Sequence, residues 1–356
     1  GTVKAEDLMA PVAFNNEYDY IDATGERLTY EKYDYAGVFS EGVAPVQKNG
    51  KFGYIDAEGE TVIEFSYDDA SPFCNGNAVV QVDEKYGYID EKGNVIIEPQ
   101  YDAAGSFGTS GLAMVQVGEK YYYINRSNER INSTPYTAAA AFDEEGFAIV
   151  ETADGYGIID TEGKEVVACK YDSIEEYSEG GLALVSKDGK YGYINREGKE
   201  VIKPQYTAAY GFSKEGLAAF EKNQKWGYIN EKGEVVIKPS FGVAYSFSNG
   251  YALVQKSKEY GYINTEGDIV IDAEYSDGGE FDQYGIAAVR QDGYYGFINQ
   301  RGEKITEMEY QNMGSFDEHG LATVEKDNRY GVINTEGELV VEIKYQAIGS
   351  FVEIKK

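Results

Sequence analysis

One short phrase recurs ten times along the 356-residue chain, and its spacing constrains the fold more than any other feature. The phrase is an aromatic residue, usually Gly, then usually Tyr-Ile, then Asp or Asn, and a Gly three residues later. With the first Gly slot counted as position 0, the copies are 34 or 35 residues apart and carry Asp19, Gly53, Gly87, Tyr122, Gly157, Gly192, Gly227, Gly261, Gly296 and Gly331 there. A fixed period of this size is typical of a repeat array, in which each unit buries its apolar surface against the next. We therefore predict one architecture for the whole chain.

The end of the phrase predicts a β-hairpin. Position +2 is Ile in every copy, position +3 is Asp or Asn, and position +6 is Gly in nine copies and Asn128 in the tenth. Because Asn is the non-Gly residue that best tolerates a left-handed backbone, position +6 closes a tight turn, with the +3 side chain able to bond the turn amides. A β-branched run such as Val236-Ile237 follows and indicates the returning strand.

The rest of the unit is equally regular. Ala stands at position −9 in all copies, Val at −7 except for Phe220, and aromatic residues at +14 and +20. The unit therefore reads as an Ala-x-Val strand, the central strand, the strand after the Gly hairpin, and a stretch with Tyr and Phe anchors that is compatible with a fourth short strand. Both faces of the central strand are apolar, which predicts sheets covered on both sides.

The two chain ends complement each other. Ala10 and Val12 form an Ala-x-Val strand without anchors before it, whereas Tyr345 and Phe351 are anchors without a strand after them. We predict an all-β fold of ten antiparallel β-meander repeats, closed into a ten-bladed β-propeller whose N- and C-terminal fragments complete one blade. An open β-solenoid or superhelix is the alternative, because propellers usually have about 4 to 8 blades. We place an N-terminal tail at residues 1–7 and a single repeat domain at residues 8–356.

A known repeat matches this pattern. The segment Lys225-Trp226-Gly227-Tyr228-Ile229-Asn230, followed by Gly233, resembles the bacterial WG-repeat family, also called KWG repeats, and the resemblance covers roughly residues 10–351. Only this copy keeps the Trp, and Asp19 and Tyr122 replace the family's Gly, so we expect these two repeats to be distorted. The resemblance implies a binding or interaction repeat of a bacterium, exported or attached to the cell surface, with a cytoplasmic location as the alternative.

The charge of the chain narrows the partners. With 62 acidic against 32 basic residues, the formal net charge is −30. Such an acidic surface repels phosphate backbones and anionic bilayers, so we expect no nucleic-acid partner and no direct membrane insertion. The charge keeps a Tyr-rich surface soluble, and we expect a monomer. No signal peptide is present, and because the chain begins at Gly1 we expect that any targeting segment has been removed.

The residues of enzyme chemistry are scarce or dispersed. The single histidine, His319, lies in a variable loop, where we expect a solvated side chain. Cys74 and Cys169 fall at different places in their repeats, so no disulfide framework is indicated. The acids recur in most turns, as structural residues do, whereas catalysis needs a unique constellation. We therefore predict no catalytic residue, metal site or cofactor, and regard a carboxylate-dependent glycan hydrolase as the least favoured function.

Most of the 33 tyrosines lie at periodic positions, where we expect core and inter-repeat packing with hydroxyls reaching the surface. The candidates for specificity are the residues outside the pattern: Tyr122, Arg126 to Arg130, Tyr210, Tyr245 and the variable loops between position +20 and the next Gly. Our leading hypothesis is a non-catalytic scaffold that binds a protein or peptide; a carbohydrate or cell-wall binding module is the alternative.

Overall fold

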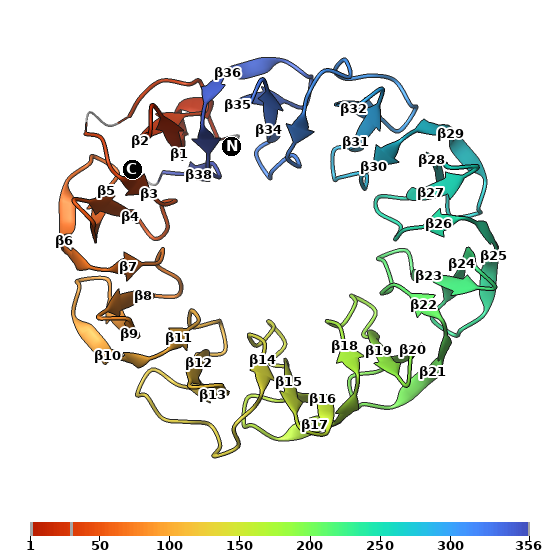
Figure 1. The fold of residues 1–356 in the computed structure, drawn as a ribbon, viewed down its shortest axis with the longest axis horizontal. Helices are drawn as coiled ribbons and strands as arrows, with labels where there is room; N and C mark the ends of the chain where they lie inside the picture. The colour runs from red at the N-terminus through yellow and green to blue at the C-terminus, as the bar shows by residue number, and fades with distance from the viewer. Residues whose placement is uncertain (1–2, 29–30, 355–356) are drawn as a thin grey trace.

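The computed structural model of the chain describes residues 3–28 and 31–354. These residues form ten small antiparallel sheets arranged in a ring (Figure 1). The only helical element among them is a single 3-10 turn, η1 (Ala5–Asp7). Accordingly, the described part of the chain holds no helix long and apolar enough to cross a membrane.

Each complete sheet is a four-stranded meander that runs from the inside of the ring to its rim. A two-residue strand forms the inner edge, two strands joined by a tight turn follow, and a seven-residue strand forms the outer edge (Figure 1). The chain then crosses to the inner edge of the next sheet. The inner two-residue strand is the fourth short strand that the Tyr and Phe anchors suggested.

The inner strands are β3 (Tyr35–Ala36), β7 (Asp69–Ala70), β11 (Ala103–Ala104), β14 (Ala138–Ala139), β18 (Ser173–Ile174), β22 (Ala208–Ala209), β26 (Val243–Ala244), β30 (Asp277–Gly278), β33 (Asn312–Met313) and β37 (Ala347–Ile348). The Ala-x-Val strands are β1 (Leu8–Phe14), β4 (Val43–Lys48), β8 (Asn77–Val82), β12 (Ala113–Val117), β15 (Ala148–Thr152), β19 (Ala183–Lys187), β23 (Leu217–Lys222), β27 (Ala252–Lys256), β31 (Ile286–Gln291) and β34 (Leu321–Lys326). The central strands are β2 (Glu17–Asp22), β5 (Lys51–Asp56), β9 (Lys85–Asp90), β13 (Lys120–Ile124), β16 (Gly155–Ile159), β20 (Lys190–Ile194), β24 (Lys225–Asn230), β28 (Glu259–Ile263), β32 (Tyr294–Asn299) and β35 (Arg329–Asn334). The outer strands are β6 (Thr61–Tyr67), β10 (Val95–Tyr101), β17 (Glu165–Tyr171), β21 (Glu200–Tyr206), β25 (Val235–Phe241), β29 (Ile269–Tyr275) and β36 (Leu339–Tyr345), and β38 (Val352–Glu353) ends the chain.

The ring closes through a sheet built from both ends of the chain. Strand β1 pairs with β2 on one side, and with β37 and β38 on the other. Val12 lies opposite Ile348, and Met9 lies opposite Val352. The protein is therefore a closed ten-bladed β-propeller, as predicted, and not an open solenoid. We call the closing sheet blade 1, and blades 2 to 10 begin at β3, β7, β11, β14, β18, β22, β26, β30 and β33.

The hairpin turns adopt the predicted geometry. In blade 2, Asp56 Oδ1 accepts hydrogen bonds from the backbone N–H groups of Glu58 at 3.0 Å and Glu60 at 2.9 Å. Gly59 at position +6 has a φ of 84°, and Asn128, the one exception to Gly, has a φ of 62°. Gly and Asn thus occur there because the turn requires a left-handed backbone.

The Gly at position 0 lets the outer strand approach the central strand. A methyl group on Gly53 would lie 2.7 Å from the carbonyl oxygen of Ile63 in the outer strand, and 3.0 Å from the backbone nitrogen of Phe65. Where Asp19 and Tyr122 replace this Gly, the described residues form no outer strand, so the expected distortion of these two blades is confirmed.

Blade 9 also lacks an outer strand among its described residues, although Gly296 is present. The sequence signal for this difference lies at position +10. The seven blades with an outer strand have Ile or Val there, whereas the other three copies have Thr29, Asn132 and Thr306. At Asn132 and Thr306, the polar residue at +10 replaces the apolar anchor that packs the outer strand onto the core in the other blades.

The core consists of apolar layers between neighbouring blades. In one layer, Tyr54 and Ile63 of blade 2 pack against Phe73, Ala78 and Val80 of blade 3. This layer depends on both faces of each sheet being apolar, as predicted from the central strand. Each blade is therefore stabilised by its two neighbours, and closure gives the first and last blades the same support.

The tyrosines at position +1 correct one expectation. Their hydroxyls do not reach the surface. In seven copies the hydroxyl donates a hydrogen bond to a backbone carbonyl 17 residues later. This carbonyl is at position +18 of the same sequence repeat, which lies in the next blade of the ring. The seven tyrosines are Tyr20, Tyr54, Tyr88, Tyr123, Tyr193, Tyr228 and Tyr262. Burial raises the pKa of each of these hydroxyls far above its ordinary value. The buried Tyr therefore links neighbouring blades through a bond that exists only in its protonated form.

Candidate binding site

Position +18 directly follows the inner strand, and its side chain varies although its backbone is fixed. The +18 carbonyl accepts the buried Tyr hydroxyl from the preceding blade in seven copies. The residues found there are Gly37, Ser71, Gly105, Ala140, Glu175, Tyr210, Tyr245, Gly279, Gly314 and Gly349. The frame thus holds the +18 backbone in place while leaving its side chain free to differ, which is what a specificity position requires.

The two tyrosines at this position, Tyr210 of blade 7 and Tyr245 of blade 8, lie together on the inner edges of adjacent blades. Their ring centroids are 6.0 Å apart, with an angle of 28° between the planes. The Tyr210 ring stacks on Trp226 at 5.2 Å and 21°, and the Tyr245 ring lies 6.5 Å from Tyr260 at 31°. We call Trp226, Tyr210, Tyr245 and Tyr260 the aromatic row.

Part of the aromatic row is exposed, and part of it is buried in the protein. Tyr210 is 36% exposed, whereas Trp226 beneath it is 8% exposed. Tyr245 and Tyr260 are half-buried. Sequence reasoning had selected Tyr210 and Tyr245 as separate departures from the pattern, but only the structure shows that they stack on each other and on the single tryptophan of the chain.

A carboxylate lies beside the row. Glu175 occupies position +18 in blade 6 and is exposed. Its Oε2 lies 3.9 Å from the point where a side chain would begin at Gly211, the residue after Tyr210. Burial raises the pKa of the Tyr210 hydroxyl, and the charges of Tyr245 and Glu175 add to that rise. Among the described residues, no Lys or Arg forms an ion pair with Glu175.

The other predicted specificity residues, Tyr122 and Arg126 to Arg130, are engaged within the protein. The Arg130 guanidinium lies 3.7 Å from the centroid of the Tyr122 ring and covers it where the outer strand is missing. Arg126 donates hydrogen bonds to Asn77 Oδ1 at 2.7 Å and to the Asn75 carbonyl at 2.8 Å in the neighbouring blade. These contacts hold Arg130 on blade 4 and tie Arg126 to blade 3, so both guanidinium groups already have partners within the protein.

A comparable contact between positions 0 and +8 occurs in blade 1. Arg27 occupies position +8, as Arg130 does, and forms an ion pair with Asp19 at position 0. Arg stands at +8 only in the two copies that have lost the position 0 Gly. The substitutions at 0 and +8 therefore form a pair in which the Arg side chain contacts the residue that replaces the Gly.

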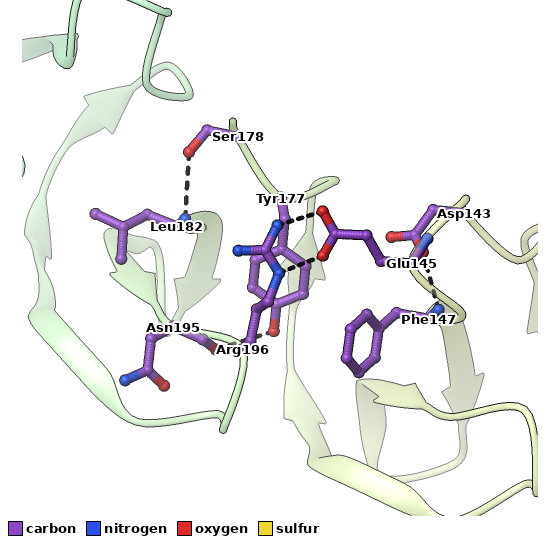
Figure 2. A network of polar contacts seen from close by, with 8 residues as sticks. All are labelled: Asp143, Glu145, Phe147, Tyr177, Ser178, Leu182, Asn195 and Arg196. Carbon is purple, nitrogen blue, oxygen red and sulfur yellow. Dashed lines mark hydrogen bonds and ion pairs between the residues drawn. The ribbon is translucent and has the colours of Figure 1, made fainter. Parts of the chain in front are cut away.

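Arg196 shows how this protein holds a guanidinium between an aromatic ring and a carboxylate (Figure 2). Its Nε lies 2.5 Å and its Nη2 2.7 Å from the two carboxylate oxygens of Glu145 in the neighbouring blade. The guanidinium carbon lies 5.4 Å from the centroid of the Tyr177 ring. The Tyr177 hydroxyl in turn donates to the Asn195 carbonyl at 2.9 Å. The bidentate pair links blades 5 and 6.

Few groups with reactive chemistry are present among the described residues. Cys74 and Cys169 are both free, and burial is the main cause that raises the pKa of the Cys169 thiol to about 12. The His319 side chain is only 15% exposed, with its Nε2 3.4 Å from Glu318, so the expectation of a solvated histidine was wrong. Within the described residues, no group of three or more His, Cys, Asp or Glu side chains is placed to hold a metal ion.

A cavity of about 270 Å³ opens in the closing blade, beside Asp19 and Arg27. Its other charged groups are also paired, since Lys32 lies 3.4 Å from Glu17 and Lys344 lies 3.5 Å from Glu342. The cavity thus accompanies the irregular outer edge of blade 1, and its charges are satisfied internally. The aromatic row with Glu175 remains the better candidate for a binding site.

Some solved structures resemble this chain in fold. A eukaryotic initiation factor aligns over 96% of this chain and 98% of its own, with a TM-score of 0.51 and 9% identity. Kluyveromyces lactis Hsv2p aligns over 68% of this chain and 96% of its own, with a TM-score of 0.41 and 10% identity. At such low identity the likeness to the initiation factor concerns the fold alone.

The family follows from the repeats themselves. The model of the WG-containing repeat matches nine times, at residues 20–52, 52–86, 86–121, 156–191, 191–226, 226–259, 260–295, 295–330 and 330–353. The chain therefore belongs to the family of WG-containing repeat proteins. The matches leave a gap between 121 and 156, where Tyr122 replaces Gly and the outer strand is missing. No curated protein matches the sequence.

Proposed function

We propose that this protein is a non-catalytic binding scaffold that holds a protein or peptide ligand on the aromatic row, at the inner edges of blades 7 and 8. The supporting observation is the pair Tyr210 and Tyr245, which stand at a position where most other blades have Gly, Ala or Ser. Tyr and Trp are the side chains most enriched at the energetic centres of protein interfaces.

The spacing of the row suits an extended peptide. Side chains on the same side of an extended strand are about 6.6 to 6.8 Å apart, since each residue advances about 3.3 to 3.4 Å. The centroid separations are 6.0 Å for Tyr210 and Tyr245 and 6.5 Å for Tyr245 and Tyr260. Alternate side chains of a bound peptide can therefore meet successive rings.

A carbohydrate is the second candidate ligand, because Tyr210 is 36% exposed and lies beside two further aromatic side chains. Sugar rings stack on such faces, and the Glu175 carboxylate could accept hydrogen bonds from their hydroxyls. The two candidates use the same residues, so one set of variants tests both.

The single tryptophan, Trp226, reports directly on the site because it stacks on Tyr210. We would follow its emission while adding pools of unstructured peptides and, separately, soluble polysaccharides. We expect peptides to change the emission and to bind at least about tenfold more weakly to the Tyr210→Ala/Tyr245→Ala variant, as expected for aromatic anchors. Alanine is tolerated at this position in blade 5, as Ala140.

A Tyr294→Ala variant controls for the loss of an exposed tyrosine elsewhere, since Tyr294 is 50% exposed and lies in blade 9. It should bind peptides as the unaltered protein does. Binding of polysaccharides but not of peptides would replace the proposed ligand with the second candidate. Peptide binding that survives the double substitution would refute the proposed site.

A further inference from the structure

The side chains at position +18 form an ordered series across three consecutive blades: Glu175, Tyr210 and Tyr245. The carboxylate of Glu175 reaches towards Gly211, the residue that follows Tyr210, so the charge lies beside Tyr210. Arginine or lysine side chains lie over rings elsewhere in the protein, at Phe107, Tyr122, Tyr171, Tyr177, Tyr295 and Tyr345. Within the described part of the chain, none lies over the aromatic row.

The protein uses the same pair of groups internally to hold an arginine. Arg196 lies between the Tyr177 ring and the Glu145 carboxylate, with two short contacts to the carboxylate and the ring at 5.4 Å (Figure 2). Arg130 lies still closer to its ring, 3.7 Å from the centroid of Tyr122. At the inner edge of blades 6 to 8 a carboxylate lies beside tyrosine rings, and no Lys or Arg of the described residues pairs with either.

We infer that Glu175, Tyr210 and Tyr245 bind the guanidinium of an arginine side chain carried by an extended peptide, which stacks on the tyrosine rings and pairs with the Glu175 carboxylate. This inference rests on the proposed function and specifies the chemistry of the ligand. Arginine suits the site better than lysine, because a planar guanidinium can stack on a ring and bond a carboxylate at the same time. The net charge of −30 favours the approach of a basic segment but does not choose where it binds.

The test compares charged and neutral versions of one peptide. The probe is acetyl-Gly-Gly-Arg-Gly-Gly-amide, and its partner carries citrulline, which keeps the shape of arginine without the charge. Binding is measured by Trp226 emission and by calorimetry at low ionic strength. We expect the arginine peptide to bind at least about fivefold more tightly than the citrulline peptide, from the ring and carboxylate interactions together.

Two carboxylate variants separate the local effect from the overall charge. Glu175→Gln should weaken the arginine peptide about three- to fivefold and leave the citrulline peptide unchanged. Glu98→Gln removes the same charge from an exposed residue of the outer strand β10, and should leave both affinities within about twofold. Tyr210→Ala should weaken the arginine peptide about tenfold.

Equal binding of the two peptides, or equal losses in Glu175→Gln and Glu98→Gln, would overturn the inference. If both peptides bind equally but lose affinity in Tyr210→Ala, the proposed function stands and only the arginine chemistry fails. If no peptide alters the Trp226 emission and Tyr210→Ala changes no affinity, the proposed function fails as well.

Discussion

The Gly at position 0 makes the sharpest prediction about the frame, and Gly227 is the best place to test it. A methyl group there would lie 2.6 Å from the backbone nitrogen of Pro239 and 2.8 Å from the carbonyl carbon of Lys238, with the Ile237 carbonyl oxygen closer still. All three atoms belong to the backbone of the outer strand β25, so no flexible side chain can move aside. Gly227→Ala must therefore push β25 away from β24.

The cost follows from what the displacement exposes. Overpacking alone typically costs about 1 to 3 kcal/mol. Ile237 and Phe241 of β25 are each 7% exposed, and exposing one such side chain costs about 1.5 to 3 kcal/mol. We expect Gly227→Ala to lower the free energy of unfolding by about 2.5 to 6 kcal/mol, the sum of the overpacking cost and the exposure of one buried side chain.

Gly105→Ala is the matched control. A methyl group at Gly105 meets only the Met114 carbonyl oxygen, at 3.5 Å, which is ordinary contact. The same position holds Ala140 in blade 5. We expect a change within about 1 kcal/mol, on the stabilising side if the unfolded chain loses freedom. Urea unfolding followed by circular dichroism and by the emission of Trp226, next to the substituted glycine, measures both variants. Equal effects of Gly227→Ala and Gly105→Ala would refute the steric role of position 0.

Three further predictions concern closure of the ring, the contact between Arg130 and Tyr122, and pH. Deleting residues 1–16 removes β1 with its buried Leu8, Met9 and Val12, so we expect the free energy of unfolding in urea to fall by at least about 5 kcal/mol. A fall of less than about 1 kcal/mol would contradict closure of the ring. Arg130→Ala should lower the free energy of unfolding by about 1 to 2 kcal/mol when Tyr122 is present, and by much less in a Tyr122→Gly background. A double-mutant cycle that shows no coupling would refute a stabilising contact between Arg130 and Tyr122. Above about pH 10 the tyrosines of the unfolded chain ionise while the buried +1 tyrosines stay protonated, so each lowers stability by up to about 1.4 kcal/mol per pH unit. The contribution of these tyrosines to stability is fully present below about pH 10. In unfolding followed by circular dichroism, the free energy of unfolding should fall less steeply with pH in Tyr228→Phe than in the unaltered protein. The same pH dependence in both proteins would count against a buried, protonated Tyr228.

The repeat of the sequence predicted most features of the fold. The complementary ends at Val12 and Phe351 predicted the closing blade, and the Gly and Asn at +6 predicted the turns. These features are local or periodic, so ten copies of one chain reveal them by comparison. The missing outer strand of blade 9 was not predicted, because blade 9 keeps the Gly at position 0 and differs from the regular blades at +10, where Thr306 replaces Ile or Val.

The candidate site was less predictable. Tyr210 and Tyr245 stood out as departures from the pattern, but Trp226 looked like an ordinary frame residue, and Glu175 was not singled out. Whether two side chains from neighbouring repeats meet depends on the angle and separation between blades, which the spacing of a sequence does not contain. The hydroxyls of the +1 tyrosines were misjudged for the same reason, because their acceptors lie in the next blade.

The central claim is that the repeated residues build the frame and that ligands bind where position +18 departs from it. Backbone amide hydrogen exchange of the protein, with and without the tightest-binding peptide from the Trp226 screen, tests this most directly. We expect new protection in the segments 208–211 and 243–246 and none in the equivalent segment 103–106 of blade 4. Protection spread evenly over all ten blades, or confined to segments away from Tyr210 and Tyr245, would contradict the claim.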